Sequence, residues 1–300
     1  MSSARVWWRG ARPRTLVAGI APVVVGGAAS GASLWQWEFA TALVVAAALQ
    51  IGVNLANDAF DGMRGVDTAE RLGPPRLVAS GAASARAVLA AALASLAVAA
   101  VAGLALALTT SPVPILAIGA LALVAALLYS GGPRPYAGLG LGELMVFLFF
   151  GLMATCGTSF VVGGTVTAAA WWSGAALGLL ADAILVANNL RDVHTDEAAG
   201  KRTLAVRLGE GRTRLLYRAC IVGAFAVIGA GVLVFIADAS AGITQWSLLA
   251  LASWPLAIKP MDAVGSATGR ELIPVLAGTA ALEAAFAALL ALGLLLDRVA

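Results

Sequence analysis

The sequence predicts an all-α protein that crosses a membrane many times. Of its 300 residues, 61% are hydrophobic and only 12% are charged, and the mean hydropathy is +0.92. A soluble domain of this size would carry about a quarter of its residues as charged side chains. Apolar runs of about twenty residues, the length that a helix needs to span the hydrocarbon core, recur along the whole chain. These observations exclude a soluble enzyme.

Charged residues and Pro- or Gly-rich breaks divide the chain into nine apolar segments. In order, we expect membrane-spanning helices at about residues 15–33, 38–57, 87–108, 113–131, 142–162, 170–189, 215–236, 244–258 and 273–296. The eighth is short and contains Pro255, which interrupts helical hydrogen bonding. No polar linker is long enough to separate two domains, so we expect a single domain over residues 1–300. No short apolar segment with a cleavage site follows the N-terminal arginines, so we expect no cleavable signal peptide.

Lysine and arginine residues distinguish the two sides of the expected helix bundle. Of the 19, all except Arg298 lie at the N-terminus or in or beside the loops after the second, fourth, sixth and eighth segments. Positive residues favour the cytoplasmic face. We therefore expect these loops and the N-terminus to be cytoplasmic, with the C-terminus on the outer side of the cell membrane.

Two polar clusters directly continue apolar segments on the expected cytoplasmic side. The first acidic cluster, residues 54–67, reads NLANDAFDGMRGVD, and the second, residues 188–203, reads NNLRDVHTDEAAGKRT. Residues four apart share one helix face. Side chains with oxygen atoms recur at this spacing at Asn57 and Asp61 in the first cluster and at Asn188, Asp192 and Asp196 in the second.

Oxygen ligands at this spacing suit Mg²⁺, which commonly takes one or two carboxylates together with substrate phosphates. Basic residues accompany the acids at Arg64, Arg71, Arg76, Arg134, Arg191, Lys201 and Arg202. Metal ions can screen one side of a diphosphate while guanidinium groups bind the other. The sequence therefore predicts a Mg²⁺–diphosphate site at the bilayer edge, for a substrate with a lipid-soluble tail. The alternative is a pair of ordinary solvated loops that carry surface ion pairs.

The motifs NDAFDGMRGVD and RDVHTD resemble the two aspartate-rich motifs of the UbiA-type intramembrane aromatic prenyltransferases. Together with GPPRLVASG and GLGELMVFLFFG, the longer blocks NLANDAFDGMRGVDT and VANNLRDVHTDEAAGKRTLAVRLG are similar to the 1,4-dihydroxy-2-naphthoate polyprenyltransferases of menaquinone synthesis. The resemblance covers about residues 8–296. In the broader superfamily a third acid follows the second by four residues, whereas here Gly65 holds that position and the acid is Asp67.

This resemblance implies nine helices around a central cavity that is capped on the cytoplasmic side by the two motif loops. It implies that Mg²⁺ and diphosphate bind Asn57, Asp61, Asp192 and Asp196, assisted by Asp58, Asp67 and Asn188. Further expected substrate-binding residues are Asn54, Arg64, Arg76, Arg134, Asp182 and Asn189. Lys201 is expected to contact phosphate or carboxylate, and Tyr129 to face the allylic carbon.

The implied reaction transfers a polyprenyl group from polyprenyl diphosphate to 1,4-dihydroxy-2-naphthoate. Mg²⁺ offsets the charge that grows on the leaving diphosphate, and the ring of Tyr129 stabilises the allylic cation through its π face. The electron-rich ring attacks this cation, and CO₂ is lost to give demethylmenaquinol. The expected partners are these two substrates and membrane lipids, with no nucleic acid; the oligomeric state is not predicted.

Several ionisable residues have more than one interpretation. Asp182 lies inside the sixth segment, where an acid either lines the substrate cavity or pairs with a neighbouring helix. His194 lies off the face shared by Asp192 and Asp196, which favours a solvated position. Arg12 is expected either to reach the phosphates or to contact lipid headgroups, and Glu143 is equally compatible with a structural or a catalytic role.

Two alternative functions are compatible with parts of the sequence. The aromatic acceptor could instead be 4-hydroxybenzoate, homogentisate or a porphyrin. A transporter would also carry intramembrane acids, but transport sites usually lie near the bilayer midplane. Here the acids gather at one edge of the membrane, which favours the enzyme.

Overall fold

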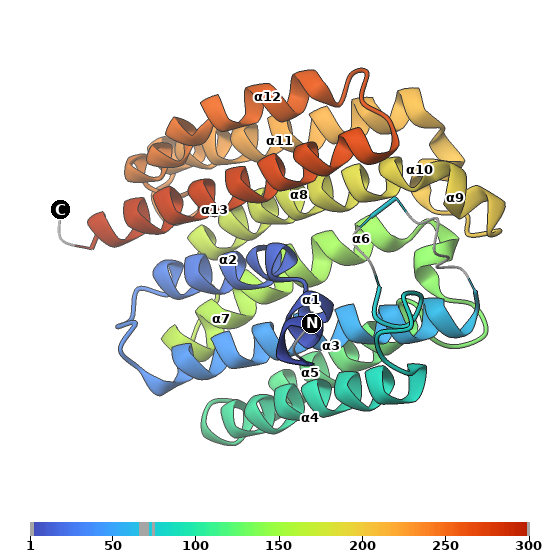
Figure 1. The fold of residues 1–300 in the computed structure, drawn as a ribbon. Coiled ribbons are helices and arrows are strands. Elements are labelled where there is room, and N and C mark those ends of the chain that lie inside the picture. The colour runs from blue at the N-terminus through green and yellow to red at the C-terminus, as the bar shows by residue number, and fades with distance from the viewer. Residues whose placement is uncertain (1–2, 66–71, 74–75, 299–300) are drawn as a thin grey trace.

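The computed structural model describes residues 3–65, 72–73 and 76–298, and every regular element among them is helical (Figure 1). The prediction of an all-α fold is confirmed. The elements are α1 Ser3–Ala11, α2 Pro13–Ala29, α3 Trp37–Met63, α4 Ala85–Thr109, α5 Pro112–Leu128, η1 Tyr136–Leu139, α6 Gly142–Val146, η2 Phe147–Met153, α7 Ala154–Gly163, α8 Ala168–Arg191, α9 Val193–Ala198, α10 Leu204–Leu208, α11 Glu210–Ala237, η3 Gln245–Ser253, α12 Pro255–Ala263, η4 Gly269–Glu271 and α13 Leu272–Leu296.

The helices are those of a multi-pass membrane protein. Among the described residues, six helical segments are long and apolar enough to cross a bilayer, namely Trp37–Met63, Ala85–Thr109, Gly142–Gly163, Ala168–Arg191, Glu210–Ala237 and Gly269–Leu296. Two shorter apolar helices, Thr15–Ala29 and Pro112–Leu128, lie where further spans are expected. The segment expected at 244–258 is divided between the 3₁₀ helix η3 and α12, which begins at Pro255, a residue favoured at the first position of a helix.

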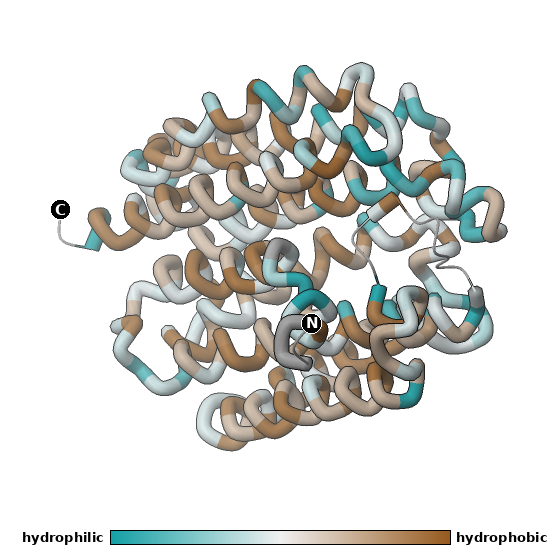
Figure 2. The backbone as a smooth tube through the Cα atoms, in the orientation of Figure 1, coloured by the Kyte–Doolittle hydropathy of each residue, from teal (hydrophilic) through white to brown (hydrophobic). Residues whose placement is uncertain are grey.

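The long helices run roughly side by side, and α8 lies inside the bundle (Figure 1). It packs against α2, α11, α13 and η2, and its small and apolar side chains are largely buried. Hydrophilic residues gather toward the end of the bundle that carries α9 and α10, whereas the helix walls are mostly apolar (Figure 2). The bundle thus has one distinctly polar end.

The segment Gly142–Gly163 departs from regular α-helical geometry in its middle. Between α6 and α7, Phe147–Met153 form a π-helix, η2. At this level the backbone of Gly151 lies directly against Gly174 and Gly178 of α8. Since π-helical turns are rare and occur frequently at functional sites, this wide turn identifies the region where η2 meets α8 as a specialised part of the bundle.

Arg298, the single basic residue on the expected outer side, closes one end of the bundle. Its guanidinium group donates hydrogen bonds to the backbone carbonyls of Gly27 and Ala28 at the C-terminal end of α2 and of Ala32 just beyond it. The carbonyls at a helix C-terminus lack intrahelical partners and carry partial negative charge. This capping role explains why an arginine lies on the side that otherwise has none.

We expect Arg298→Ala to destabilise the protein by about 1 kcal/mol, because several α2 carbonyls lose a cationic donor. The melting temperature of the detergent-solubilised protein would fall by about 2–4 °C. Arg298→Lys should lose less stability than Arg298→Ala, because lysine keeps the positive charge although it lacks the planar guanidinium group. A melting temperature unchanged in both variants would contradict the capping role.

Candidate functional site

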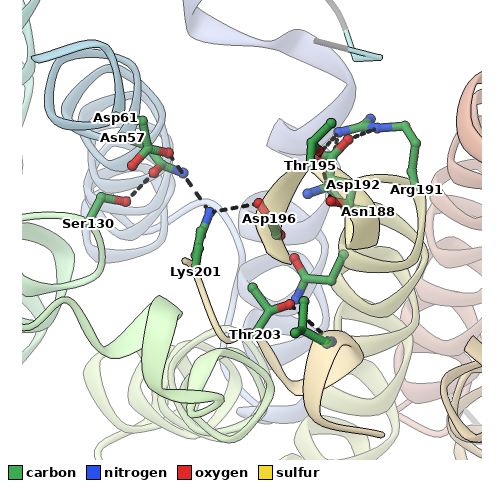
Figure 3. A network of polar contacts seen from close by, with 12 residues as sticks. Asn57, Asp61, Ser130, Asn188, Arg191, Asp192, Thr195, Asp196, Lys201 and Thr203 are labelled. Atoms are coloured by element: carbon green, nitrogen blue, oxygen red, sulfur yellow. Dashed lines mark hydrogen bonds and ion pairs between the residues drawn. The ribbon is translucent and has the colours of Figure 1, made fainter. Parts of the chain in front are cut away.

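The two acidic clusters meet at the polar end of the bundle (Figure 3). Asn57 and Asp61 lie on the last turns of α3, which continues to Met63, beyond the expected end of the apolar segment. Asp196 lies on α9, and the Nζ of Lys201 is 3.9 Å from Asp61 Oδ2 and 3.8 Å from Asp196 Oδ1. Lys201 therefore bridges carboxylates from the two clusters. The expectation that both clusters face one site agrees with this geometry.

The second cluster keeps its four-residue spacing across a break between two helices. Asp192 ends α8 with φ −96° and ψ 7°, yet its amide donates to the Asn188 carbonyl at 3.2 Å, and the Asp196 amide donates to the Asp192 carbonyl at 2.8 Å. The spacing therefore stays helical. Gly200, with φ +72°, turns the chain after α9, and the Lys201 amide donates to the Asp196 carbonyl at 2.8 Å. A residue with a Cβ would be strained at Gly200, so the glycine helps to aim Lys201 back at the acids.

The loop after α5 forms one wall of the site. The Ser130 hydroxyl donates to Asn57 Oδ1, and Arg64 donates to the Gly132 carbonyl at 2.6 Å. Arg64, expected to bind substrate, is exposed and here holds this loop in place. Arg134 is also exposed, and together with Asp61 and Lys201 it lines a side cavity of about 270 Å³.

Two tyrosines stand at the boundary between this polar end and the apolar interior. The rings of Tyr129 and Tyr136 pack edge to face, with centroids 5.4 Å apart. The Tyr136 hydroxyl donates to the Ala125 carbonyl at 3.0 Å. Burial raises the pKa of Tyr136 above its ordinary value, so its phenol stays protonated and remains a donor. The hydrogen bond and the ring contact together fix the position of Tyr129.

The carboxylate of Asp58 has a structural role. Its Oδ2 accepts the backbone amide of Leu77 at 2.8 Å, and its Oδ1 accepts that of Val78 at 3.1 Å. Both carboxylate oxygens thereby hold the loop that follows the first cluster. The neighbouring Asn57 points instead toward Ser130 and Lys201 (Figure 3).

We expect Asp58→Ala to cost about 2–4 kcal/mol of stability, because two backbone amides lose their acceptor. Thermal melting should show the loss, and limited proteolysis should begin within residues 76–84. An unchanged melting temperature together with a weakened response to Mg²⁺ would instead make Asp58 a metal ligand, as the sequence pattern indicates.

Arg191 is one of the basic residues that the sequence places beside the acids, and the structure shows its contacts. Its guanidinium group is buried and forms a two-pronged pair with Asp192, the Nε–Oδ1 distance being 2.8 Å. It also donates to Asn188 Oδ1 at 2.9 Å, and Gly73 lies against its guanidinium plane. Arg191 therefore orients two second-cluster residues and contacts the loop that follows the first cluster. The sequence indicates the basic residue beside the acids, but not that it binds Asp192 and Asn188.

A cavity of about 1420 Å³ extends from this polar site into the apolar interior. At one end it is lined by Asn57, Asp192, Asp196 and Lys201, and further along by apolar side chains such as Phe149 and Phe150. It follows α8 from Trp171 to Asp192, which is about 30 Å at the helical rise per residue. Such a cavity holds a charged group at one end and a long apolar chain along its length.

The remaining expected site residues divide between the cavity and the protein interior. Asn54, Arg76, Asn188 and Asn189 line the large cavity. Asn189 also donates to Glu143 Oε1 at 2.9 Å. Asp182 is buried in α8, and within the described part of the chain it is not among the residues that line the large cavity. Asp67 lies outside the described residues. His194 is exposed and lies 3.0 Å from Glu210, as expected of a solvated residue.

Mg²⁺ would need help from its substrate to bind here. Among the described residues, no group of three or more carboxylate, histidine or cysteine side chains is close enough to hold a metal ion alone. Facing carboxylates from α3 and α8–α9, with Asn57 and Asn188 beside them, leave room for ligands between the clusters. This donor set fits Mg²⁺ bound through substrate phosphates.

Comparison with known proteins relates the chain to one family. Residues 19–262 match the UbiA prenyltransferase family. The chain is 47% identical to the 1,4-dihydroxy-2-naphthoate octaprenyltransferase of Mycobacterium tuberculosis, with 93% of each chain covered. It is 34% identical to the protein of the same name from Escherichia coli, with 92% of this chain and 88% of the relative covered.

Solved structures share the fold. A UbiA homolog from Aeropyrum pernix superimposes with a TM-score of 0.67 at 19% identity, covering 94% of this chain and 97% of that one. A UbiA homolog from Archaeoglobus fulgidus bound to GPP and Mg²⁺ gives a TM-score of 0.65 at 18% identity, covering 97% and 99%. At these identities the likeness establishes the fold alone.

Proposed function

Since this chain belongs to the UbiA prenyltransferase family, we propose that it transfers a polyprenyl group from polyprenyl diphosphate to 1,4-dihydroxy-2-naphthoate. CO₂ and diphosphate are released, and demethylmenaquinol is formed for menaquinone synthesis. One observation carries this proposal: Lys201 joins Asp61 and Asp196 at the mouth of a long apolar cavity. The relatives that carry the naphthoate prenyltransferase name supply the acceptor.

Asn57, Asp61, Asp192 and Asp196 hold the Mg²⁺-bound diphosphate head in this proposal. When bound, Mg²⁺ supplies Lewis-acid stabilisation of the departing diphosphate. Lys201, already between the facing carboxylates, donates to the phosphate oxygens. Arg76 is buried and lines the same cavity, and it adds a guanidinium fork on the other side of the anion. These fixed charges favour departure of the leaving group without a protein nucleophile.

The apolar part of the cavity binds the prenyl chain and protects the reactive carbon. The C–O bond breaks with its electron pair leaving on the diphosphate, and the ring of Tyr129 faces the resulting allylic cation. The naphthoate ring supplies the electron pair of the new C–C bond, and loss of CO₂ restores aromaticity. Phe149 and Phe150 line the cavity and keep water from the cation, which would otherwise be converted to an alcohol.

The proposal includes the way in which the chain lies in the membrane. The chain forms a single domain of nine spans in the cell membrane, in which α2, α5 and the pair η3–α12 complete the six longer spans. The distribution of lysine and arginine supports a cytoplasmic site. The polyprenyl chain remains in the bilayer interior while the diphosphate head reaches the cytoplasmic edge.

The test uses purified protein in lipid nanodiscs with polyprenyl diphosphate, Mg²⁺ and one acceptor at a time. We expect a prenylated product and stoichiometric CO₂ with 1,4-dihydroxy-2-naphthoate, and neither with homogentisate. Prenylation of 4-hydroxybenzoate without CO₂ release would replace the naphthoate assignment by another acceptor. Absence of every prenylated product, with transport of an ion or lipid across the membrane, would overturn the enzymatic assignment.

A further inference from the structure

The corner between α1 and α2 holds a strained arginine. Arg12 has φ 53° and ψ 71°, and it is the one residue other than glycine with positive φ among the residues that the structure describes. This conformation is uncommon for a residue with a Cβ, and the residue that precedes a proline, here Pro13, is normally extended. Such strain persists only where the surrounding structure imposes it, and it is concentrated at functional sites.

A hydrogen-bond network from α3 imposes this conformation. Asn54 Nδ2 donates to the Ala11 carbonyl at 3.1 Å, and the Thr15 hydroxyl donates to the Arg12 carbonyl at 3.0 Å. Because a carbonyl can only accept, these two hydrogen bonds fix the donor and the acceptor in the other hydrogen bonds of the network. The Thr15 oxygen must then accept from Asn54 Nδ2 at 3.0 Å and from Gln50 Nε2 at 3.3 Å.

The same logic fixes the orientation of Gln50. Its Nε2 also lies 3.5 Å from Asn54 Oδ1, so its amide nitrogen faces the network and its Oε1 points away. The side chain is buried, with 7% of the residue exposed. Among the described residues, Gln50 Oε1 has no hydrogen-bond donor. A buried acceptor without a donor is costly, which indicates a partner that arrives with a ligand.

These groups belong to the wall of the large cavity. Arg12, Thr15, Gln50 and Asn54 all line it. Gly19 lines it opposite Gln50, and a Cβ there would stand 3.6 Å from Gln50 Oε1. Tyr129 lines the same cavity, as do Asn57, Asp192 and Asp196. The strained corner therefore shares one cavity with the residues of the Mg²⁺–diphosphate end and with the ring expected to face the allylic carbon.

We propose that Arg12 and Gln50 form the binding site for the aromatic acceptor, an assignment that rests on the proposed function. The Arg12 guanidinium binds the acceptor carboxylate, and Gln50 Oε1 accepts a hydrogen bond from a ring hydroxyl. In 1,4-dihydroxy-2-naphthoate the 1-hydroxyl donates an intramolecular hydrogen bond to the adjacent carboxylate. The 4-hydroxyl is therefore the donor that is free to bind the protein. A buried group built to bind a hydroxyl discriminates against analogues that lack it.

Three naphthyl probes that differ by one group each test this assignment by equilibrium binding without polyprenyl diphosphate. 4-Hydroxy-2-naphthoate carries both groups, 2-naphthoate lacks the hydroxyl, and 1-naphthol lacks the carboxylate. We expect the first to bind about 10-fold more tightly than 2-naphthoate and about 10- to 100-fold more tightly than 1-naphthol. Arg12→Gly, which accepts the positive φ and so preserves the corner, should remove the carboxylate preference. Gln50→Leu should remove the hydroxyl preference, and exposed Gln245→Leu should change neither.

Kinetics distinguish this assignment from the proposed function itself. In both site variants the KM for the acceptor should rise about 10-fold or more, while the KM for polyprenyl diphosphate stays unchanged. A raised KM for the diphosphate alone, or equal binding of all three probes by the unaltered protein, would overturn the acceptor site. Prenylation with unchanged acceptor KM in both variants would refute the site but leave the function standing. The expected probe preferences without any prenylation would refute the function alone.

Discussion

Asp61→Asn should lower the rate of prenyl transfer at saturating substrate by about 10²–10³-fold. Asp61 faces Lys201 and, beyond it, Asp196 from the other cluster. Without the Asp61 charge, the site holds Mg²⁺ less tightly and stabilises the departing diphosphate less. Substitution by Asn keeps the size and hydrogen bonding of the side chain, so the loss reports the charge.

The measurement is turnover as a function of Mg²⁺ concentration, with binding of polyprenyl diphosphate followed separately. We expect the Mg²⁺ concentration at half-maximal rate to rise together with the loss of turnover. Glu197→Gln is the matched control, because Glu197 follows Asp196 on α9 but is exposed. Asp61→Asn with more than a tenth of the original turnover and an unchanged Mg²⁺ response would refute the assignment of Asp61 to the metal–diphosphate site.

The convergence of the two acidic clusters was predictable because it follows from helix length and direction. Each cluster continues an even-numbered apolar segment, so both must emerge on the same face of a membrane. Four-residue spacing then gives each cluster one common face. The structure places Asp61 of α3 and Asp196 of α9 on either side of Lys201 accordingly.

The division of labour within each cluster depends on tertiary contacts that spacing does not report. Asp58 is adjacent to Asn57, but its carboxylate binds amides 19 and 20 residues further along the chain. The deciding partners of Asp58 are backbone amides, and backbone amides leave no mark in the sequence.

The polar face of α3 around Gln50 is visible in the sequence. Gln50 lies four residues before Asn54 and seven before Asn57, so the polar face of α3 extends deep into an apolar segment. An amide at that position is costly unless it has a partner. The acceptor of its amide N–H group, the Thr15 hydroxyl of α2, lies 35 residues away. The spacing of these amides therefore indicates a polar face, but only the structure shows which groups donate and which accept.

The π-helix η2 was not predictable, because an apolar run has the same composition whether its hydrogen bonds span four residues or five. Its packing against α8 leads to an expected effect on stability. A Cβ at Gly151 would lie 2.5 Å from the Gly178 Cα and 2.6 Å from the Gly174 carbonyl oxygen, both backbone atoms of α8. Backbone atoms cannot rotate away as side chains do, so even one methyl group must push η2 and α8 apart.

We therefore expect Gly151→Ala to destabilise the protein by about 1–3 kcal/mol, with a fall in melting temperature of about 2–10 °C. Gly229→Ala is the matched control, because Gly229 is also inside an apolar helix but a Cβ there meets nothing within 4 Å. At such a site the same substitution stabilises a helix or leaves it unchanged. Since α8 carries Asn188 and leads into Asp192, Gly151→Ala should also weaken binding of polyprenyl diphosphate with Mg²⁺. Equal melting temperatures for the two alanine variants would show that η2 and α8 can separate at no cost, contrary to their close backbone packing.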